Sequence, residues 1–160
     1  MEINQKVKSL IELKKIVPQL KAKGKKIVFT NGCFDILHYG HVKYLEDAKK
    51  KGDVLIVAIN TDASVKKIKG VKRPLVTQLD RARVVAGLSS VDFVLLFGER
   101  TPLKVITALK PDVLVKGGDW KKEKIVGADF VCDRGGRVLT IDFLKNRSTT
   151  GLIKKIAKIF

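Results

Sequence analysis

The sequence predicts an α/β protein with a Rossmann-like, doubly wound and mainly parallel sheet of five strands. Five short apolar, β-branched runs alternate with amphipathic stretches along the 160 residues, and strands that alternate with helices in this order form parallel sheets. Most of these runs are continuous apolar blocks, as expected for strands buried on both faces. A chain of this length is expected to form one domain, residues 1–160, around one core.

An N-terminal helical extension, residues 1–24, precedes the first strand. Its main helix is expected to begin after Ser9, because this serine can cap the helix and Glu12 completes a capping box three residues later. Pro18 is expected to kink or divide the helix, since proline removes a backbone donor. Gly24 is expected to mark the helix end.

The five expected strands cover residues 26–30, 54–60, 92–97, 112–115 and 137–141. Three helices have recognisable starts: Thr77 opens TQLD, Thr101 precedes a proline at the first helical position, and Ser148 opens STTGLIKKIAKI. In doubly wound sheets, ligands bind at the carboxyl ends of the strands, where the strand order reverses. Functional residues are therefore expected in the loops that follow the strands.

Both histidines of the chain, His38 and His41, follow the first strand closely. That strand is expected to lead into a loop at 31–37 and a helix at 39–50, so the two side chains project from the same side of a helix start. The free N–H groups of a helix start favour an anion, and Gly40 would let a phosphate approach the backbone. A phosphate site is favoured over zinc, which needs further ligands. The structural alternative is a core role for the first histidine and a surface role for the second.

Composition limits the function classes. The chain has 33 Lys plus Arg against 16 Asp plus Glu, a formal charge of +17, which attracts nucleotides, sugar phosphates and nucleic acid alike. Most lysines are equally well explained as a solvated surface. There is no apolar run that could cross a bilayer and no secretory signal pattern, so a cytoplasmic protein without a membrane partner is expected. The two cysteines, Cys33 and Cys132, are expected to be reduced core thiols.

Two ordered signatures carry a family resemblance. FTNGCFDILHYGH at 29–41 resembles the first signature of the HxGH nucleotidyltransferase superfamily, and NRSTTGLIKKI at 146–156 resembles its second. With RP at 73–74, SVDFV at 90–94 and PDVLVKGGDW at 111–120, the set is similar to D-glycero-β-D-manno-heptose 1-phosphate adenylyltransferases, the ADP-heptose synthases of lipopolysaccharide precursor synthesis. The likeness spans nearly the whole chain. Neither a P-loop nor a G-x-G-x-x-G motif is present.

The resemblance implies an adenylyltransferase that joins ATP and heptose 1-phosphate to give ADP-heptose and pyrophosphate, without a covalent enzyme intermediate. A phosphate monoester has its second pKa near ~6, so the attacking oxygen is largely ionised at neutral pH and needs no general base. The work of the enzyme is then to position two polyanions and to neutralise developing charge. Mg²⁺ is expected to arrive with the nucleotide, because it prefers phosphate oxygens and water.

The resemblance and the helix starts together give the expected site residues. Catalytic roles fall to His38, His41, Lys69 and Arg73, the last two in a basic loop that would close over the phosphates. Sugar phosphate contacts are expected from Asp35, Lys69 and Arg73. The alternatives are a capping role for Asp35 and a surface ion pair for Arg81. Residues expected to bind ATP are Thr30, Asn31, Gly32, Cys33, Phe34, Gly40, His41, Arg81, Lys116, Gly117, Gly118, Asp119, Trp120, Ser148, Thr149 and Thr150.

Two other functions stay open at this stage. Trp120 stands where heptose adenylyltransferases often have tyrosine, and glycerol-3-phosphate cytidylyltransferases often show GDDW, so a sibling enzyme is the first alternative. The second is a basic nucleic-acid-binding module, which would show clustered stacking aromatics or a recognition helix; the sequence shows neither, and no nucleic-acid partner is expected. The resemblance also implies a homodimer and, because this chain carries no kinase half, a separate heptose kinase upstream in the pathway.

Overall fold

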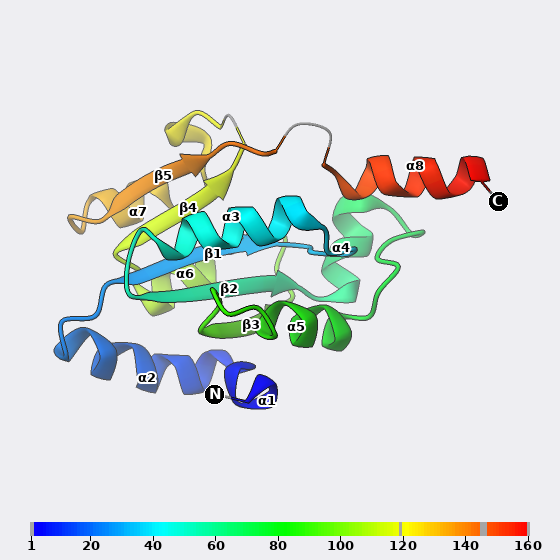
Figure 1. The fold of residues 1–160 in the computed structure, drawn as a ribbon. Helices are drawn as coiled ribbons and strands as arrows, with labels where there is room; N and C mark the ends of the chain where they lie inside the picture. Colours follow the sequence, from blue (N-terminus) through cyan, green and yellow to red (C-terminus); the bar gives the residue numbers. More distant parts are fainter. Residues whose placement is uncertain (1, 119, 145–146, 160) are drawn as a thin grey trace.

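The computed structural model describes residues 2–118, 120–144 and 147–159, arranged as Figure 1 shows. Five strands form one parallel sheet in the order β3-β2-β1-β4-β5. The predicted doubly wound, Rossmann-like α/β class is confirmed, and the sheet is parallel throughout. The strand bounds are β1 Ile27–Gly32, β2 Val54–Asn60, β3 Phe93–Phe97, β4 Val113–Gly117 and β5 Arg137–Ile141.

The strands form where the apolar runs predict them, to within two residues at each end. Every residue of β2 is buried, as expected for a strand that is covered by helices on both faces. β1 and β4 run two residues further than predicted, to Gly32 and Gly117. The loop expected at 31–37 therefore begins only after Gly32.

Helices cover both faces of the sheet (Figure 1). On one face, the buried side chains of Leu45 and Val85 belong to the cluster that joins two helices to the strands. These helices are α3 (Tyr39–Lys49) and α5 (Gln78–Ala86). The other face is covered by α2 (Leu10–Ala22), α6 (Leu103–Leu109) and α7 (Ala128–Cys132). The remaining helical segments are α1 (Ile3–Lys6), α4 (Asp62–Lys69), the 3-10 helix η1 (Lys122–Lys124) and α8 (Thr149–Ile159).

The helix α2 begins where the capping box predicts. Ser9 Oγ accepts a hydrogen bond from Glu12 N at 3.2 Å, and the Glu12 carboxylate accepts one from Ser9 N at 2.8 Å. The expected division at Pro18 is wrong, because α2 continues through this residue. Pro18 and Lys14, whose carbonyl loses its helical donor, are both exposed, so water can replace the missing bond.

The other helix starts follow their capping residues closely. Thr77 caps α5 and accepts a hydrogen bond from Asp80 N at 3.3 Å. Ser148 precedes α8 and accepts a hydrogen bond from Gly151 N at 3.0 Å. Pro102 is the N-cap of α6 rather than its first helical residue, so α6 begins one position later than predicted.

Two expectations need correction. Lys69 is the last residue of α4, a helix that the sequence patterns did not mark, so it lies on a helix and not in the basic loop. Of the two thiols expected in the core, Cys33 is partly buried, but Cys132 is exposed at the end of the short α7.

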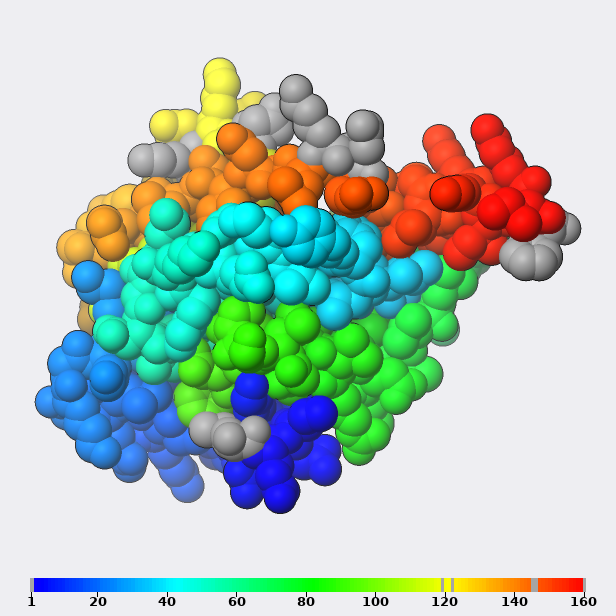
Figure 2. Space-filling view, viewed as in Figure 1, coloured from blue at the N-terminus to red at the C-terminus, as the bar shows by residue number. Residues whose placement is uncertain are grey.

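The last helix, α8, stands apart from the layered body. Figure 2 shows it, in red, projecting to one side of the molecule, and none of its described residues is buried. Its start is tied back to the first-strand loop, where Thr149 Oγ1 donates to Ile36 O at 3.3 Å. Within the described part of the chain, no helix combines the length and the apolar character needed to cross a membrane.

The packing of α2 makes a testable prediction about the N-terminal extension. Leu13 is fully buried, so Leu13→Ala is expected to lower the free energy of unfolding by about 3 kcal/mol in urea denaturation. Ile11 on the same helix is 71% exposed, and Ile11→Ala should change the stability by less than about 0.5 kcal/mol. Equal losses in the two variants would contradict the packing of α2 onto the sheet.

Candidate active site

A cavity of about 610 Å³ opens at the carboxyl ends of β1, β2 and β4. β1 pairs with β4 only through Val28 and Phe29, whereas it pairs with β2 from end to end. The two strands therefore separate at the point where the strand order reverses, as expected for a ligand site in a doubly wound sheet. Predicted site residues that line the cavity are Asn31, Gly32, Cys33, Phe34, Asp35, His41, Lys69, Arg73, Lys116, Gly117, Trp120, Thr149 and Thr150.

Other predicted site residues lie beside the cavity rather than in its lining. Thr30 is fully buried, and its hydroxyl is 2.6 Å from the Tyr44 hydroxyl. Ser148 serves as the cap of α8. His38, Gly40, Arg81 and Gly118 also lie outside the lining. Asp119 lies outside the described residues.

The loop after β1 turns sharply at Phe34, which has a left-handed backbone conformation with φ of 48°. This conformation is uncommon for a residue with a side chain. It places the Phe34 ring against Gly32, where an added Cβ would lie 2.8 Å from a ring carbon, and 5.3 Å from the His41 ring between centroids. Gly32 is thus required by the close approach of this ring.

The two histidines form a stacked pair at the start of α3, with ring centroids 3.9 Å apart. Burial, together with the neighbouring His38, lowers the pKa of His41 to about 4. Burial and the charge of Arg147 also lower the pKa of His38. Both Nδ1 atoms are buried without a hydrogen-bond partner in the part of the chain that the structure describes. At neutral pH the pair therefore offers uncharged imidazoles with unpaired polar atoms.

Gly40 packs closely between these side chains. An added Cβ would lie 3.0 Å from the His38 ring and 3.1 Å from Arg147 Cβ. The glycine thus brings the arginine of the second signature next to the histidines of the first. This contact joins the two signatures, which lie more than a hundred residues apart in the sequence.

The cavity contains several cationic side chains. Lys116 Nζ lies 3.4 Å from Asn31 Oδ1 and so bridges the gap between β4 and β1. Burial lowers the pKa of Lys116, and the nearby Lys69 adds to this effect. Arg73 Nε donates to Asp35 at 2.5 Å. The arrangement suits a ligand with several negative charges.

Aromatic rings gather at the end of β4. A Cβ added to Gly117 would lie 2.6 Å from Phe143 Cζ and 3.3 Å from a Tyr44 ring carbon. Gly118 has a φ of 94°, and a Cβ there would lie 3.1 Å from Phe143 and 3.6 Å from Trp120. Only glycines allow this approach. The result is a flat, apolar recess beside the cations, which suits a nucleobase.

Sequence reasoning missed several lining residues. Tyr44 lies one turn after His41 on α3, and Asn60 and Arg100 follow the expected rule for carboxyl ends of strands, so these three could have been found. Thr101 and Pro102 follow β3 and Phe143 follows β5, so the same rule covers them as well. The remaining lining residues join the cavity through the folding of the chain; these are Ile68, Leu114, Lys124, Ile125 and Val126.

Comparisons with known proteins agree with this geometry. A family model described as cytidylyltransferase-like matches residues 29–138. The bifunctional protein HldE of Geobacter metallireducens is 54% identical over 155 residues, which cover 97% of this chain and 32% of that protein. The same-named protein of Campylobacter concisus is 56% identical over 151 residues, 94% of this chain and 31% of that protein. The chain thus spans about a third of the length of these relatives.

Two solved structures are similar to this chain. The lipopolysaccharide core biosynthesis protein from Thermoplasma volcanium has 29% identity and a TM-score of 0.62, covering 78% of this chain and all of that one. A pantoate-beta-alanine ligase from Francisella tularensis has a TM-score of 0.61 at 17% identity, covering 95% of this chain and 78% of the ligase. The second likeness concerns the fold alone.

The partly buried His41 predicts a pH dependence of stability. The pKa of His41 is about 4 in the folded chain and 6.5 as the ordinary value, so the unfolded chain binds more protons between these pH values. The stability contribution of neutral His41 is present above pH 6.5 and is lost as the pH falls towards 4. In chemical denaturation from pH 7 to 4, wild type should lose more stability than His41→Gln. Parallel losses in both proteins would contradict the burial of this imidazole.

Proposed function

The chain belongs to the cytidylyltransferase-like family, and on this premise we propose that it is an adenylyltransferase that joins ATP and D-glycero-β-D-manno-heptose 1-phosphate. The products are ADP-heptose and pyrophosphate, for lipopolysaccharide precursor synthesis. The observation that carries the proposal is the cavity in which His41 of the stacked histidine pair, several cations and an aromatic recess meet. The similarity to HldE proteins and to the lipopolysaccharide core biosynthesis protein supports the choice of substrates.

The proposed reaction is an in-line displacement. An oxygen of the sugar 1-phosphate attacks the α-phosphorus of ATP and forms a new P–O bond, while the bond to the β-phosphate breaks and pyrophosphate leaves with its electron pair. The attacking phosphate is largely ionised at neutral pH, so no proton needs to be removed. Catalysis then depends on alignment and on stabilisation of the charge that develops on the phosphoryl oxygens.

The lining residues have distinct roles in this proposal. The imidazole of His41 donates a hydrogen bond to the α-phosphate, and Thr149 and Thr150 at the start of α8 bind the β- and γ-phosphates. Lys69 and Arg73 neutralise the charge of the phosphates from the side of α4. The adenine lies in the recess formed by Gly117, Trp120 and Phe143.

Mg²⁺ enters this proposal as part of the nucleotide substrate. Among the described residues, no three His, Cys, Asp or Glu side chains gather into a group that could hold a metal ion. Asp35, the carboxylate among the described residues that line the cavity, already accepts hydrogen bonds from Arg73, Leu75 and Val76. Phosphate oxygens and water are sufficient ligands for Mg²⁺.

The family resemblance supports further parts of the proposal. The acceptor is a sugar phosphate, so a kinase activity that phosphorylates the heptose must act before this step. The enzyme is proposed to act as a homodimer in the cytoplasm, with residues 1–160 forming one domain of each subunit. Analytical ultracentrifugation measures the oligomeric state directly.

The experiment that tests the proposed function is pyrophosphate release with magnesium, crossing ATP and CTP against heptose 1-phosphate and glycerol 3-phosphate. Release only with ATP and heptose 1-phosphate is expected. Release with CTP and glycerol 3-phosphate would instead support a glycerol-3-phosphate cytidylyltransferase. Trp120 and the description of the family are compatible with this alternative. Absence of release in all four mixtures would reject both assignments.

The histidine pair makes a prediction about turnover. His41→Ala is expected to lower kcat by about 10²- to 10³-fold, as for the loss of one donor to a developing oxyanion, with the circular dichroism spectrum unchanged. Tyr39 lies on the same helix and is 59% exposed, so Tyr39→Ala is the control and should keep wild-type turnover. Undiminished turnover in His41→Ala would remove this residue from the catalytic site.

A further inference from the structure

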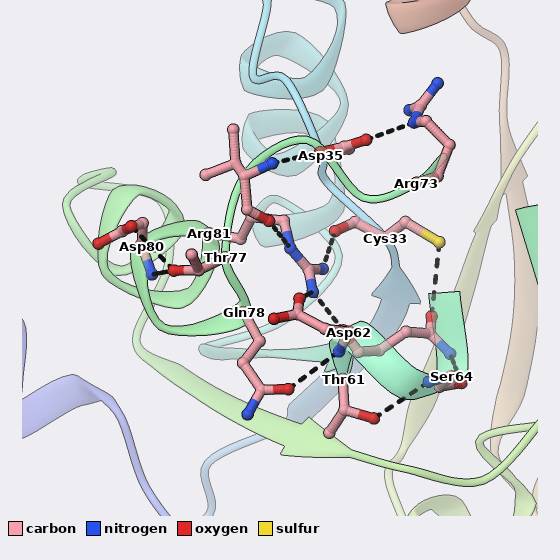
Figure 3. A network of polar contacts seen from close by, with 12 residues as sticks. Cys33, Asp35, Thr61, Asp62, Ser64, Arg73, Thr77, Gln78, Asp80 and Arg81 are labelled. Carbon is pink, nitrogen blue, oxygen red and sulfur yellow. Dashed lines mark hydrogen bonds and ion pairs between the residues drawn. The ribbon is translucent and has the colours of Figure 1, made fainter. Parts of the chain in front are cut away.

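The loop between α4 and α5, residues 70–76, carries Arg73 to the cavity without regular secondary structure of its own. We call it the basic loop. A segment of this kind keeps one position only if other parts of the protein hold its backbone. Figure 3 shows the polar contacts that do so, and two buried charged side chains, Asp35 and Arg81, lie at their centre.

Asp35 accepts three hydrogen bonds from the basic loop. Its Oδ1 accepts from Leu75 N at 2.8 Å and from Val76 N at 3.0 Å, and its Oδ2 accepts from Arg73 Nε at 2.5 Å. The Asp35 side chain is only 1% exposed. Burial by itself would raise the pKa of Asp35, but the hydrogen bonds from Val76, Arg73 and Leu75 outweigh it and hold this pKa below its ordinary value. The Asp35 carboxylate is therefore charged, and its oxygens already accept hydrogen bonds from the basic loop.

Arg81 connects the basic loop to neighbouring segments by hydrogen bonds. Its guanidinium donates to Val76 O at 3.0 Å, at the end of the basic loop, and to Cys33 O at 2.5 Å, just after β1. It also donates to Asn60 O at the end of β2 and to Asp62 at the start of α4, both at 2.8 Å. Arg81 is 1% exposed. It thus ties the basic loop to the ends of β1 and β2, which both border the cavity.

The contact between Asp35 and Arg73 has a consequence for ligand binding. It uses Nε of the guanidinium and leaves the fork of Nη1 and Nη2 directed away from the carboxylate (Figure 3). Such a fork matches two oxygens of a phosphate group. An arginine that is fixed in this way loses little side-chain entropy when it binds the ligand.

We infer that Asp35 is a positioning residue that fixes the basic loop and presents the Nη fork of Arg73 to the triphosphate, rather than a contact for the sugar phosphate. The inference rests on the proposed function for the identity of the ligand. A positioning role and a direct sugar contact differ in one respect that can be measured. If Asp35 is a positioning residue, it affects nucleotide binding, and only through Arg73.

The test measures the affinity for MgATP by calorimetry without any acceptor, in wild type, Asp35→Asn, Arg73→Ala and the double variant. Asparagine keeps one oxygen for the two backbone N–H groups but loses the charged acceptor of Arg73. Asp35→Asn and Arg73→Ala are each expected to weaken binding at least about tenfold, as for a lost hydrogen bond to a charged group. The double variant should bind no more weakly than Arg73→Ala, because one effect runs through the other.

Asp47→Asn is the matched control. Asp47 is a carboxylate that pairs with Lys43 and Lys50 on α3 and does not line the cavity. Its removal should leave the MgATP affinity unchanged. Multiplied losses in the double variant, or an unaltered affinity in Asp35→Asn, would overturn the inference.

A second measurement follows the loop without any ligand. The amides of Leu75 and Val76 should exchange their hydrogens at least about tenfold faster in Asp35→Ala than in wild type, while Asp35→Asn keeps most of their protection. Unchanged exchange in Asp35→Ala would show that Asp35 does not hold the loop. A protein that follows these expectations but makes no ADP-heptose would reject the proposed function alone.

Discussion

The pairing of β1 with β4 ends well before the carboxyl ends of these strands, and the rest of the site depends on this separation. β1 pairs with β2 along its length but with β4 only through Val28 and Phe29. The helices beside these strands, α3 and α6, pack on opposite faces of the sheet, so neither fills the gap. The ends of β1 and β4 and the loop after β1 line the cavity at this gap. The fold itself therefore supplies the place for a ligand.

The gap combines cationic side chains, one charged carboxylate, and groups whose pKa is lowered by burial. Burial lowers the pKa of both His41 and Lys116, whereas Asp35 remains charged because three donors compensate for its burial. A bound polyphosphate would favour the charged forms of the imidazole and the ammonium group. Ligand binding and protonation are thereby linked in this cavity, and the formal charge of +17 adds a general attraction for anions.

The charged residues near the site show where sequence reasoning stops. Arg81 was expected to bind ATP or to form a surface ion pair, and the structure instead uses it as a buried donor to three backbone carbonyls and Asp62. For Asp35, the alternative that it caps backbone N–H groups describes its contacts. These N–H groups belong to Leu75 and Val76, in a loop forty residues away. Nothing in the local sequence marks either side chain as buried, because their partners are backbone atoms of distant segments.

The sequence by itself determined the features that depend on neighbouring residues. The five strands, the caps at Ser9, Thr77 and Ser148, and the histidine pair at a helix start all follow from local patterns of apolar, capping and glycine residues. Only the tertiary structure decided which strand ends meet, that Phe143 closes the recess over Gly117, and which cations line the cavity. The physical reason is that these contacts arise from strand order and from packing between segments far apart in the chain, whereas caps and strand runs arise within a few residues.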